Sequence, residues 1–176
     1  MRLPITLSEI APRVATGAFL LNSGLGKRHV DEATAAGLHG FAGGAYPFLA
    51  KVPPATFATA LSTSEIVIGA ALLTPFVPTA VAGAALTGFS AGLVGLYLRT
   101  PGMTKPGRSV APTPEGLPVA KDVWMLGIGL GLLASGLGNR GGSTRTSSIA
   151  PSRRDRTSAR KAARKAAATM REAVTA

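Results

Sequence analysis

The sequence predicts an all-α integral membrane protein, a four-helix bundle followed by a basic cytoplasmic tail. Three stretches of about 20 mostly apolar residues are each long enough to cross a bilayer. Only 15% of the 176 residues are charged, whereas soluble domains carry about 25%. The charge is also uneven, because residues 138–176 hold ten lysine and arginine residues against two acidic ones, and the rest of the chain is nearly neutral.

Four spans are predicted in order along the chain. The first, residues 7–26, is the least uniform, because Arg13 and Asn22 lie within it. Arg13 is close enough to the start of the helix for its side chain to reach the interface. The other three spans are residues 56–76, 79–98 and 119–137. Pro75 and Pro78 bracket a short turn that makes the second and third spans an antiparallel hairpin.

Two longer connections separate the remaining spans. Residues 28–54 include an apolar, glycine-rich stretch that is too short to cross a bilayer, so we expect an interfacial or re-entrant segment there. Residues 99–121 are rich in Pro, Gly, Thr and Ser and predict a plain loop. Small residues spaced four apart predict close helix contacts in the third and fourth spans, at Ala84, Gly88 and Gly92 and at Gly127 and Gly131.

The chain divides into a four-span domain, residues 1–137, and a basic tail, residues 138–176. Composition predicts disorder over residues 138–157 and an alanine-rich amphipathic helix over residues 158–174. A basic helix beside a span suits anionic lipid headgroups, and a solvated tail that only sets topology accounts for the same composition. Nucleic-acid binding is not expected, because the high pI belongs to the tail alone.

Basic residues predict the orientation in the membrane. Four spans place both termini on one side, and the ten cations of the tail favour the cytoplasm for that side. The two longer connections would then face outward with seven cations, counting Lys27 beside the first of them. The N-terminus has no uninterrupted apolar region before a cleavage site, so a cleaved signal peptide is not expected.

Glu65 is the most informative single residue, because it lies within the otherwise apolar stretch 56–76. A carboxylate at bilayer depth is costly unless it is protonated, paired or facing a polar cavity. One interpretation is therefore a proton, ion or headgroup site. The other is a neutral glutamic acid that holds helices together through hydrogen bonds.

Four other polar residues in or beside the spans are candidates for the same site. Asn22 and Lys27 are expected on the outer side of Glu65, and Arg13 on the opposite half of the membrane. Asp122 opens the fourth span, where a carboxylate also stabilises the helix N-terminus. We therefore take Glu65, Asn22 and Lys27 as a buried polar site for a proton, with Arg13 and Asp122 as secondary candidates.

Several kinds of chemistry have no support in the sequence. The chain has no cysteine, which excludes disulfides and thiol catalysis within it. His29 and His39 lie ten residues apart without further ligands at metal-binding spacing, so no metal site is expected. No motif for a nucleophile and its base or for phosphate binding appears, so the chain does not look like a complete enzyme.

Several short motifs follow one another along about residues 10–137, namely Arg13-x-x-x-Gly17, Gly24-x-x-Lys27, Glu65-x-x-x-Gly69-x-x-Leu72, Lys121-Asp122 and Leu126-Gly127. Together they resemble the DoxX family of small four-helix membrane proteins. The resemblance implies a bacterial plasma-membrane protein of an oxidoreductase-linked family, in which some relatives are subunits of a thiosulfate:quinone oxidoreductase and others associate with enzymes of oxidative or sulfur stress. It maps the polar positions of the family onto Arg13, Lys27, Glu65 and Asp122.

Three functional hypotheses follow. The first is an accessory or quinone-proximal subunit of a membrane oxidoreductase, with an oxidoreductase or sulfur-transfer enzyme as its partner. The second is a small proton-coupled transporter, for which a carboxylate in the membrane is the usual requirement. The third is a scaffold without catalytic function, in which the polar residues only hold the helices together.

Overall fold

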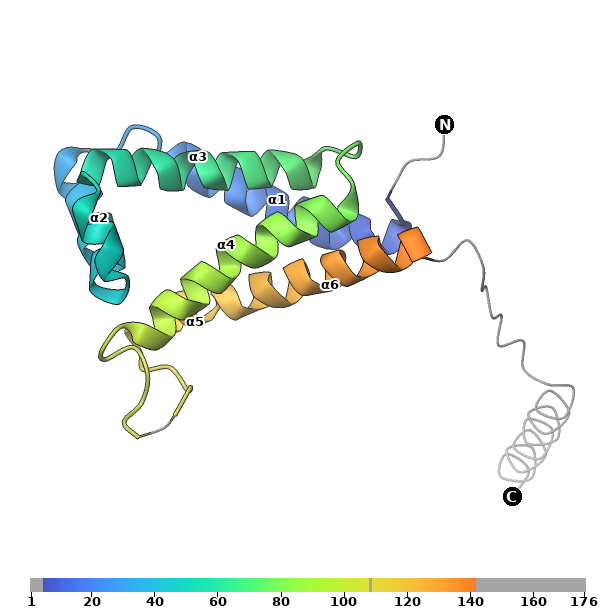
Figure 1. The fold of residues 1–176 in the computed structure, drawn as a ribbon. Coiled ribbons are helices and arrows are strands. Elements are labelled where there is room, and N and C mark those ends of the chain that lie inside the picture. The colour runs from blue at the N-terminus through green and yellow to red at the C-terminus, as the bar shows by residue number, and fades with distance from the viewer. Residues whose placement is uncertain (1–4, 108, 142–176) are drawn as a thin grey trace, which may run out of the picture. The chain divides into compact units, whose positions relative to one another are not determined.

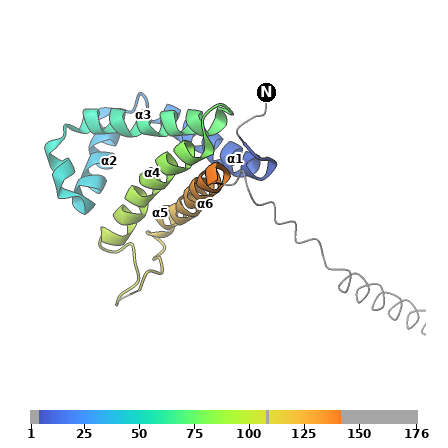
Figure 2. The same cartoon turned by 45° about the vertical axis from the view of Figure 1, so that its right-hand side comes forward.

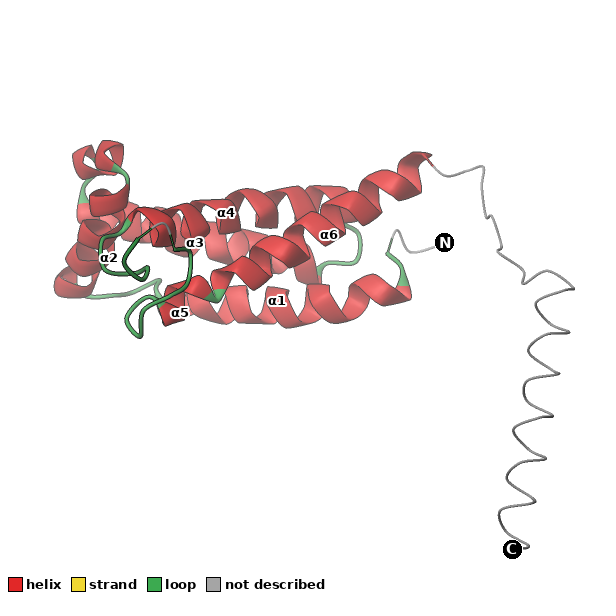
Figure 3. Ribbon diagram, turned by 90° about the horizontal axis from the view of Figure 1, so that it is seen from below, coloured by secondary structure: helices red, strands yellow, loops and turns green. Residues whose placement is uncertain are grey.

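The structure is a computed structural model and describes residues 5–107 and 109–141. In this part of the chain every regular element is helical, so the predicted all-α class is confirmed there. The elements are α1 (Leu7–Gly26), α2 (Glu32–Ala45), the short 3-10 helix η1 (Pro47–Lys51), α3 (Pro54–Leu73), α4 (Thr79–Arg99), α5 (Leu117–Ala120) and α6 (Asp122–Gly141) (Figure 1). Figure 3 shows the same elements as helices joined by loops.

Three helical segments are long and apolar enough to cross a membrane, namely Pro54–Leu73, Thr79–Arg99 and Leu117–Gly138. The protein itself covers few of their residues. In the most apolar stretch of each segment, only 33%, 33% and 17% of the residues are buried, in the same order. Large apolar side chains such as Val67, Val81 and Leu130 are half exposed or more. Apolar helices with an apolar outer surface are typical of proteins that face lipid.

The bounds of the predicted spans are confirmed at some ends and wrong at others. The helix predicted as the first span has the predicted bounds, 7–26, but it is not among the three segments that are apolar enough to cross a membrane. The second is displaced, because α3 begins at Pro54, where a proline is tolerated, and ends at Leu73 rather than 76. Thr74 precedes a proline and adopts an extended conformation with ψ 115°, which ends the helix. At the other end of the chain, α6 continues to Gly141, so residues 138–141 are helical; the rest of the predicted tail lies outside the described residues.

The two longer connections contain more structure than the sequence predicts. Residues 28–54 include α2 and η1. Helix α2 runs from the start of α3 toward the end of α4 and contacts both helices (Figures 1 and 2). Asp31 caps α2 by accepting a hydrogen bond from the backbone N–H of Thr34 at 2.7 Å, and hydrogen bonding to Thr34 holds the pKa of Asp31 below its usual range. The predicted plain loop 99–121 includes the short helix α5.

The long helices pack as two pairs, α1 with α3 and α4 with α6. The contacts within each pair are far more extensive than the contacts between the pairs. Glycines make both contacts close. A Cβ atom added at Gly69 of α3 would lie 2.7 Å from the backbone nitrogen of Leu21 in α1. In the second pair, a Cβ atom at Gly83 of α4 would collide with the backbone of Leu133, and one at Gly136 with the backbone of Ala80.

The small-residue contacts predicted from the sequence are wrong in detail. Gly88 and Gly92 of α4 and Gly127 and Gly131 of α6 all face open space, where an added Cβ would meet nothing within 4 Å. The sequence is rich in small residues on several faces of these helices, and spacing alone does not show which face meets a neighbour. The face that packs includes Gly83 and Gly129 instead.

A matched pair of variants in α4 tests this packing. Gly83→Ala is expected to lower the free energy of unfolding by about 1–3 kcal/mol, because the added methyl group forces α4 and α6 apart. Gly88→Ala is expected to leave stability unchanged or to raise it slightly, because alanine is the better helix former and the position is open. Unfolding by sodium dodecyl sulfate in mixed micelles measures both. Equal effects of the two variants would contradict the packing.

The two helix pairs meet at the 74–78 turn that joins α3 to α4, and they separate toward their other ends (Figures 1 and 2). Near the turn, the space between the pairs is filled by a core that includes Leu20 and Leu72 from the first pair and Leu86 and Leu132 from the second. We call this the narrow end and the opposite end, where α2 and α5 lie, the wide end. The candidate site lies at the wide end.

Candidate functional site

A cavity of about 390 Å³ lies between the two helix pairs at the wide end. Most of its wall is apolar, and four phenylalanines contribute to it: Phe19, Phe41, Phe57 and Phe89. Its polar lining side chains are few: Ser23, Lys27, Glu65 and Asp122. A largely apolar cavity with a few convergent polar groups is the usual form of a binding site for a small molecule.

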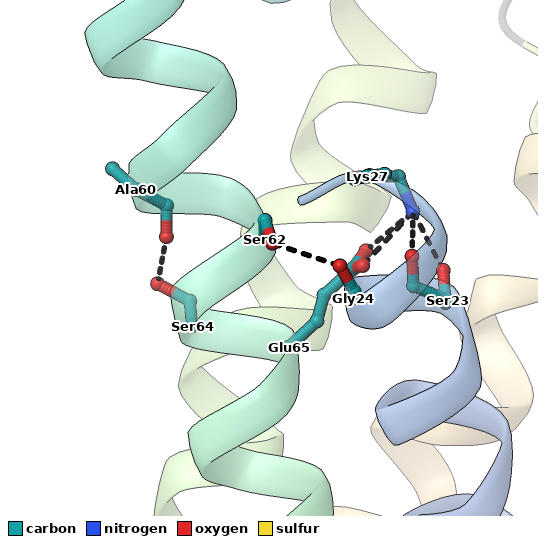
Figure 4. A network of polar contacts seen from close by, with 7 residues as sticks. All are labelled: Ser23, Gly24, Lys27, Ala60, Ser62, Ser64 and Glu65. Carbon is teal, nitrogen blue, oxygen red and sulfur yellow. Dashed lines mark hydrogen bonds and ion pairs between the residues drawn. The ribbon is translucent and has the colours of Figure 1, made fainter. Parts of the chain in front are cut away.

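Lys27 and Glu65 form an ion pair at this cavity (Figure 4). The Nζ atom of Lys27 lies 3.0 and 2.9 Å from the two carboxylate oxygens of Glu65, and it also donates to the hydroxyl of Ser23 at 2.6 Å. Glu65 is 6% exposed, and the side chain of Lys27 is 24% exposed. The pairing offsets part of the cost of burying this carboxylate.

Close packing of α1 against α3 brings the two charges together. The Ser62 hydroxyl donates to the carbonyl oxygen of Gly24 at 2.8 Å, one turn of α3 from Glu65 (Figure 4). A Cβ atom at Gly24 would lie 2.8 Å from the carbonyl oxygen of Ser62, so only glycine allows this approach without displacement. Lys27 follows directly after the end of α1, where a cation also interacts favourably with the helix dipole.

Asp122 reaches the cavity from the opposite helix pair, as the first residue of α6. Its position matches the predicted helix N-terminus, but its carboxylate accepts no hydrogen bond from the part of the chain that the structure describes. The cavity therefore combines one cation with two carboxylates, and one of these carboxylates has no hydrogen-bonding partner among the described residues.

The structure brings together three of the predicted site residues, Glu65, Lys27 and Asp122, and separates the other two from them. The side chain of Asn22 is exposed and does not line the cavity. Its neighbour Ser23 does, because successive residues of a helix point about 100° apart. Arg13 lies at the narrow end, on the opposite half of the fold from Lys27, as the sequence predicts.

At the narrow end the Arg13 side chain is 2% exposed and is surrounded by hydrogen-bond acceptors. Its guanidinium donates to the carbonyl oxygens of Ala71 (3.0 Å), Leu72 (2.9 Å), Thr74 (2.9 Å) and Val77 (3.2 Å) and to the hydroxyl of Thr79 (3.2 Å). The last carbonyls of a helix have no partner within it, so Arg13 caps α3 and binds the turn to α4.

Glu9 completes this buried cluster, although it is not among the predicted site residues. It is 3% exposed and accepts hydrogen bonds from the hydroxyls of Thr79, at 3.0 Å, and Ser135. The cluster of Glu9, Arg13, Thr79 and Ser135 thereby joins α1, α4 and α6. Its signal in the sequence is the spacing of Glu9 and Arg13, since residues four apart share one helix face.

No arrangement of the described residues suits a metal ion, because no three His, Asp or Glu side chains gather within residues 5–107 and 109–141. A ring nitrogen of His39 instead lies 2.9 Å from the carbonyl oxygen of Leu49, a contact that joins α2 to η1.

Comparisons with protein-family models, with curated proteins and with solved structures found no match.

Proposed function

We propose that this chain is an accessory, quinone-binding subunit of a membrane-associated oxidoreductase or oxidative-stress complex, of the DoxX type. The observation that carries the proposal is the Lys27–Glu65 ion pair at the wall of an apolar, aromatic cavity. The DoxX-like motifs contribute Lys27, Glu65 and Asp122, three of the four polar residues at that cavity.

The residues of the cavity suit the head of a quinone. A quinone ring is flat and apolar on its faces, which fits phenylalanine walls, and its two carbonyl oxygens require donors. The ammonium group of Lys27 lines the cavity and would donate to a quinone oxygen by giving up one of its present bonds to Ser23 and Glu65. The carboxylate of Asp122 is a site that can take up a proton. When bound, a quinone would supply the electron-transfer chemistry that these side chains lack.

We further propose that α1 is a fourth span and that the chain is a four-helix bundle of the bacterial inner membrane with both termini in the cytoplasm. The hydrogen bond between Glu9, near the start of α1, and Ser135, in α6, supports one side for both ends of the domain. The basic residues after Gly141 favour the cytoplasm for that side and contact with anionic lipid headgroups.

Purification of the tagged full-length chain from native membranes in mild detergent tests the proposal. We expect mass spectrometry to find a stoichiometric oxidoreductase or sulfur-transfer enzyme and lipid extraction to find a quinone. Glu65→Gln should release the quinone, because the ion pair that orients Lys27 is lost. Ser64→Ala is the matched control, since Ser64 is exposed and bonds only to its own helix.

A chain that purifies alone, with lipid but neither partner nor quinone, would contradict this function. It would favour a scaffold, the second candidate, which has its own support in the structure. Lys27 and Glu65 satisfy one another and fasten α1 to α3, as a purely structural pair would. In that case Glu65→Gln changes the melting temperature but not the composition of the purified material.

A further inference from the structure

A second hollow, of about 250 Å³, lies between α1 and α6. We call it the α1–α6 groove; its lining residues are Ala15, Thr16 and Phe19 from α1, Trp124, Met125 and Ile128 from α6, and Lys121. The lining is almost entirely apolar. Phe19 is 51% and Trp124 75% exposed, so the groove is open to the surroundings of the helices.

The groove adjoins the cavity. Phe19 and Met125 line both hollows, so their side chains are the partition between them. The two helices that form the groove belong to different pairs and contact each other little. The partition therefore consists of side chains rather than packed backbone, and one of the two is methionine, which adapts readily to a new shape.

We propose that the α1–α6 groove holds the alkyl or isoprenoid tail of the ligand whose polar head lies at Lys27 and Glu65. This assignment rests on the proposed function. The cavity is large enough for a ring-shaped head but not for a long tail beside it. A tail that leaves between Phe19 and Met125 meets an apolar surface that opens toward lipid, while the head keeps the polar groups.

The chain supplies its own probe for the position of the tail. Trp124 is its single tryptophan and lines the groove. Bromine quenches tryptophan fluorescence only at close contact, so we use a ubiquinone analogue with a ten-carbon tail, with and without a terminal bromine. We expect the brominated probe to quench Trp124 at least twofold more strongly. Equal quenching by the two probes would overturn the assignment. A competition experiment gives a second way to overturn it. If brominated phosphatidylcholine quenches Trp124 and the unbrominated analogue does not relieve that quenching, the groove is a site for lipid acyl chains.

Two neighbouring positions on α1 make a matched pair for affinity. Ala15 lines the groove and Val14 does not, and both side chains are exposed, so a larger side chain at either enters no core. We expect Ala15→Phe to weaken binding of the ten-carbon analogue at least tenfold relative to a tail-free ubiquinone, and Val14→Phe to leave that ratio unchanged.

The outcomes separate this assignment from the function on which it rests. Suppose that the ten-carbon analogue and the tail-free ubiquinone both bind the wild-type chain. If Ala15→Phe then changes neither affinity, or lowers both equally, the tail assignment fails and the head site stands. If neither probe binds the wild-type chain, the head site fails, and the tail assignment fails with it.

Discussion

Replacing Lys27 with methionine is expected to lower the free energy of unfolding by about 3 kcal/mol, because it leaves the carboxylate of Glu65 buried without its partner. This value is at the low end of the cost of removing one partner from a buried ion pair, because the side chain of Lys27 is still 24% exposed. Unfolding by sodium dodecyl sulfate in mixed micelles at neutral pH measures the change.

The double variant Lys27→Met/Glu65→Leu separates stability from binding. Exchanging a buried ion pair for apolar residues is often nearly neutral, so we expect stability within about 1 kcal/mol of wild type. The double variant should nevertheless lose the quinone, because the donor in the cavity is gone. A double variant that retains the quinone and its partner protein would contradict a role of this pair in binding and leave it a structural one.

The second large effect is expected at the narrow end. Arg13→Met should lower the free energy of unfolding by about 3–5 kcal/mol, since it leaves three backbone carbonyls and the Thr79 hydroxyl without their donor. The fourth carbonyl, that of Thr74, keeps a hydrogen bond from the backbone N–H of Val77. Arg13→Lys should recover only part of this loss, because an ammonium group has three donors and a guanidinium five. Both variants are measured in the same unfolding assay.

Arg28→Met is the control for Arg13, because it removes an exposed arginine just after α1. It should change stability by less than about 0.5 kcal/mol. If Arg13→Lys were as stable as wild type, charge alone would account for the cluster, and the geometry of the guanidinium would be irrelevant.

Some of the candidate site could be predicted from the sequence, and some could not. Glu65 is conspicuous as a carboxylate in an apolar stretch, and Lys27 and Asp122 as the charged residues beside two span ends. That Lys27 rather than Asn22 meets Glu65 could not be predicted, because it depends on the rotation of α1 against α3. Glu9 was missed because an acidic residue in the first turn of a helix is ordinary, and only the position of Thr79 and Ser135 makes it part of a buried cluster.

The sequence by itself determined the helical class, the approximate bounds of the long helices and the concentration of positive charge after Gly141. The length of apolar runs and the position of prolines are local properties. Only the tertiary structure decided which glycines pack and which charges meet. Helices that are apolar on every face carry little periodic signal to show which side is buried. Contacts such as that between Arg13 and Thr79, 66 residues apart in the chain, therefore depend on how the helices pack together.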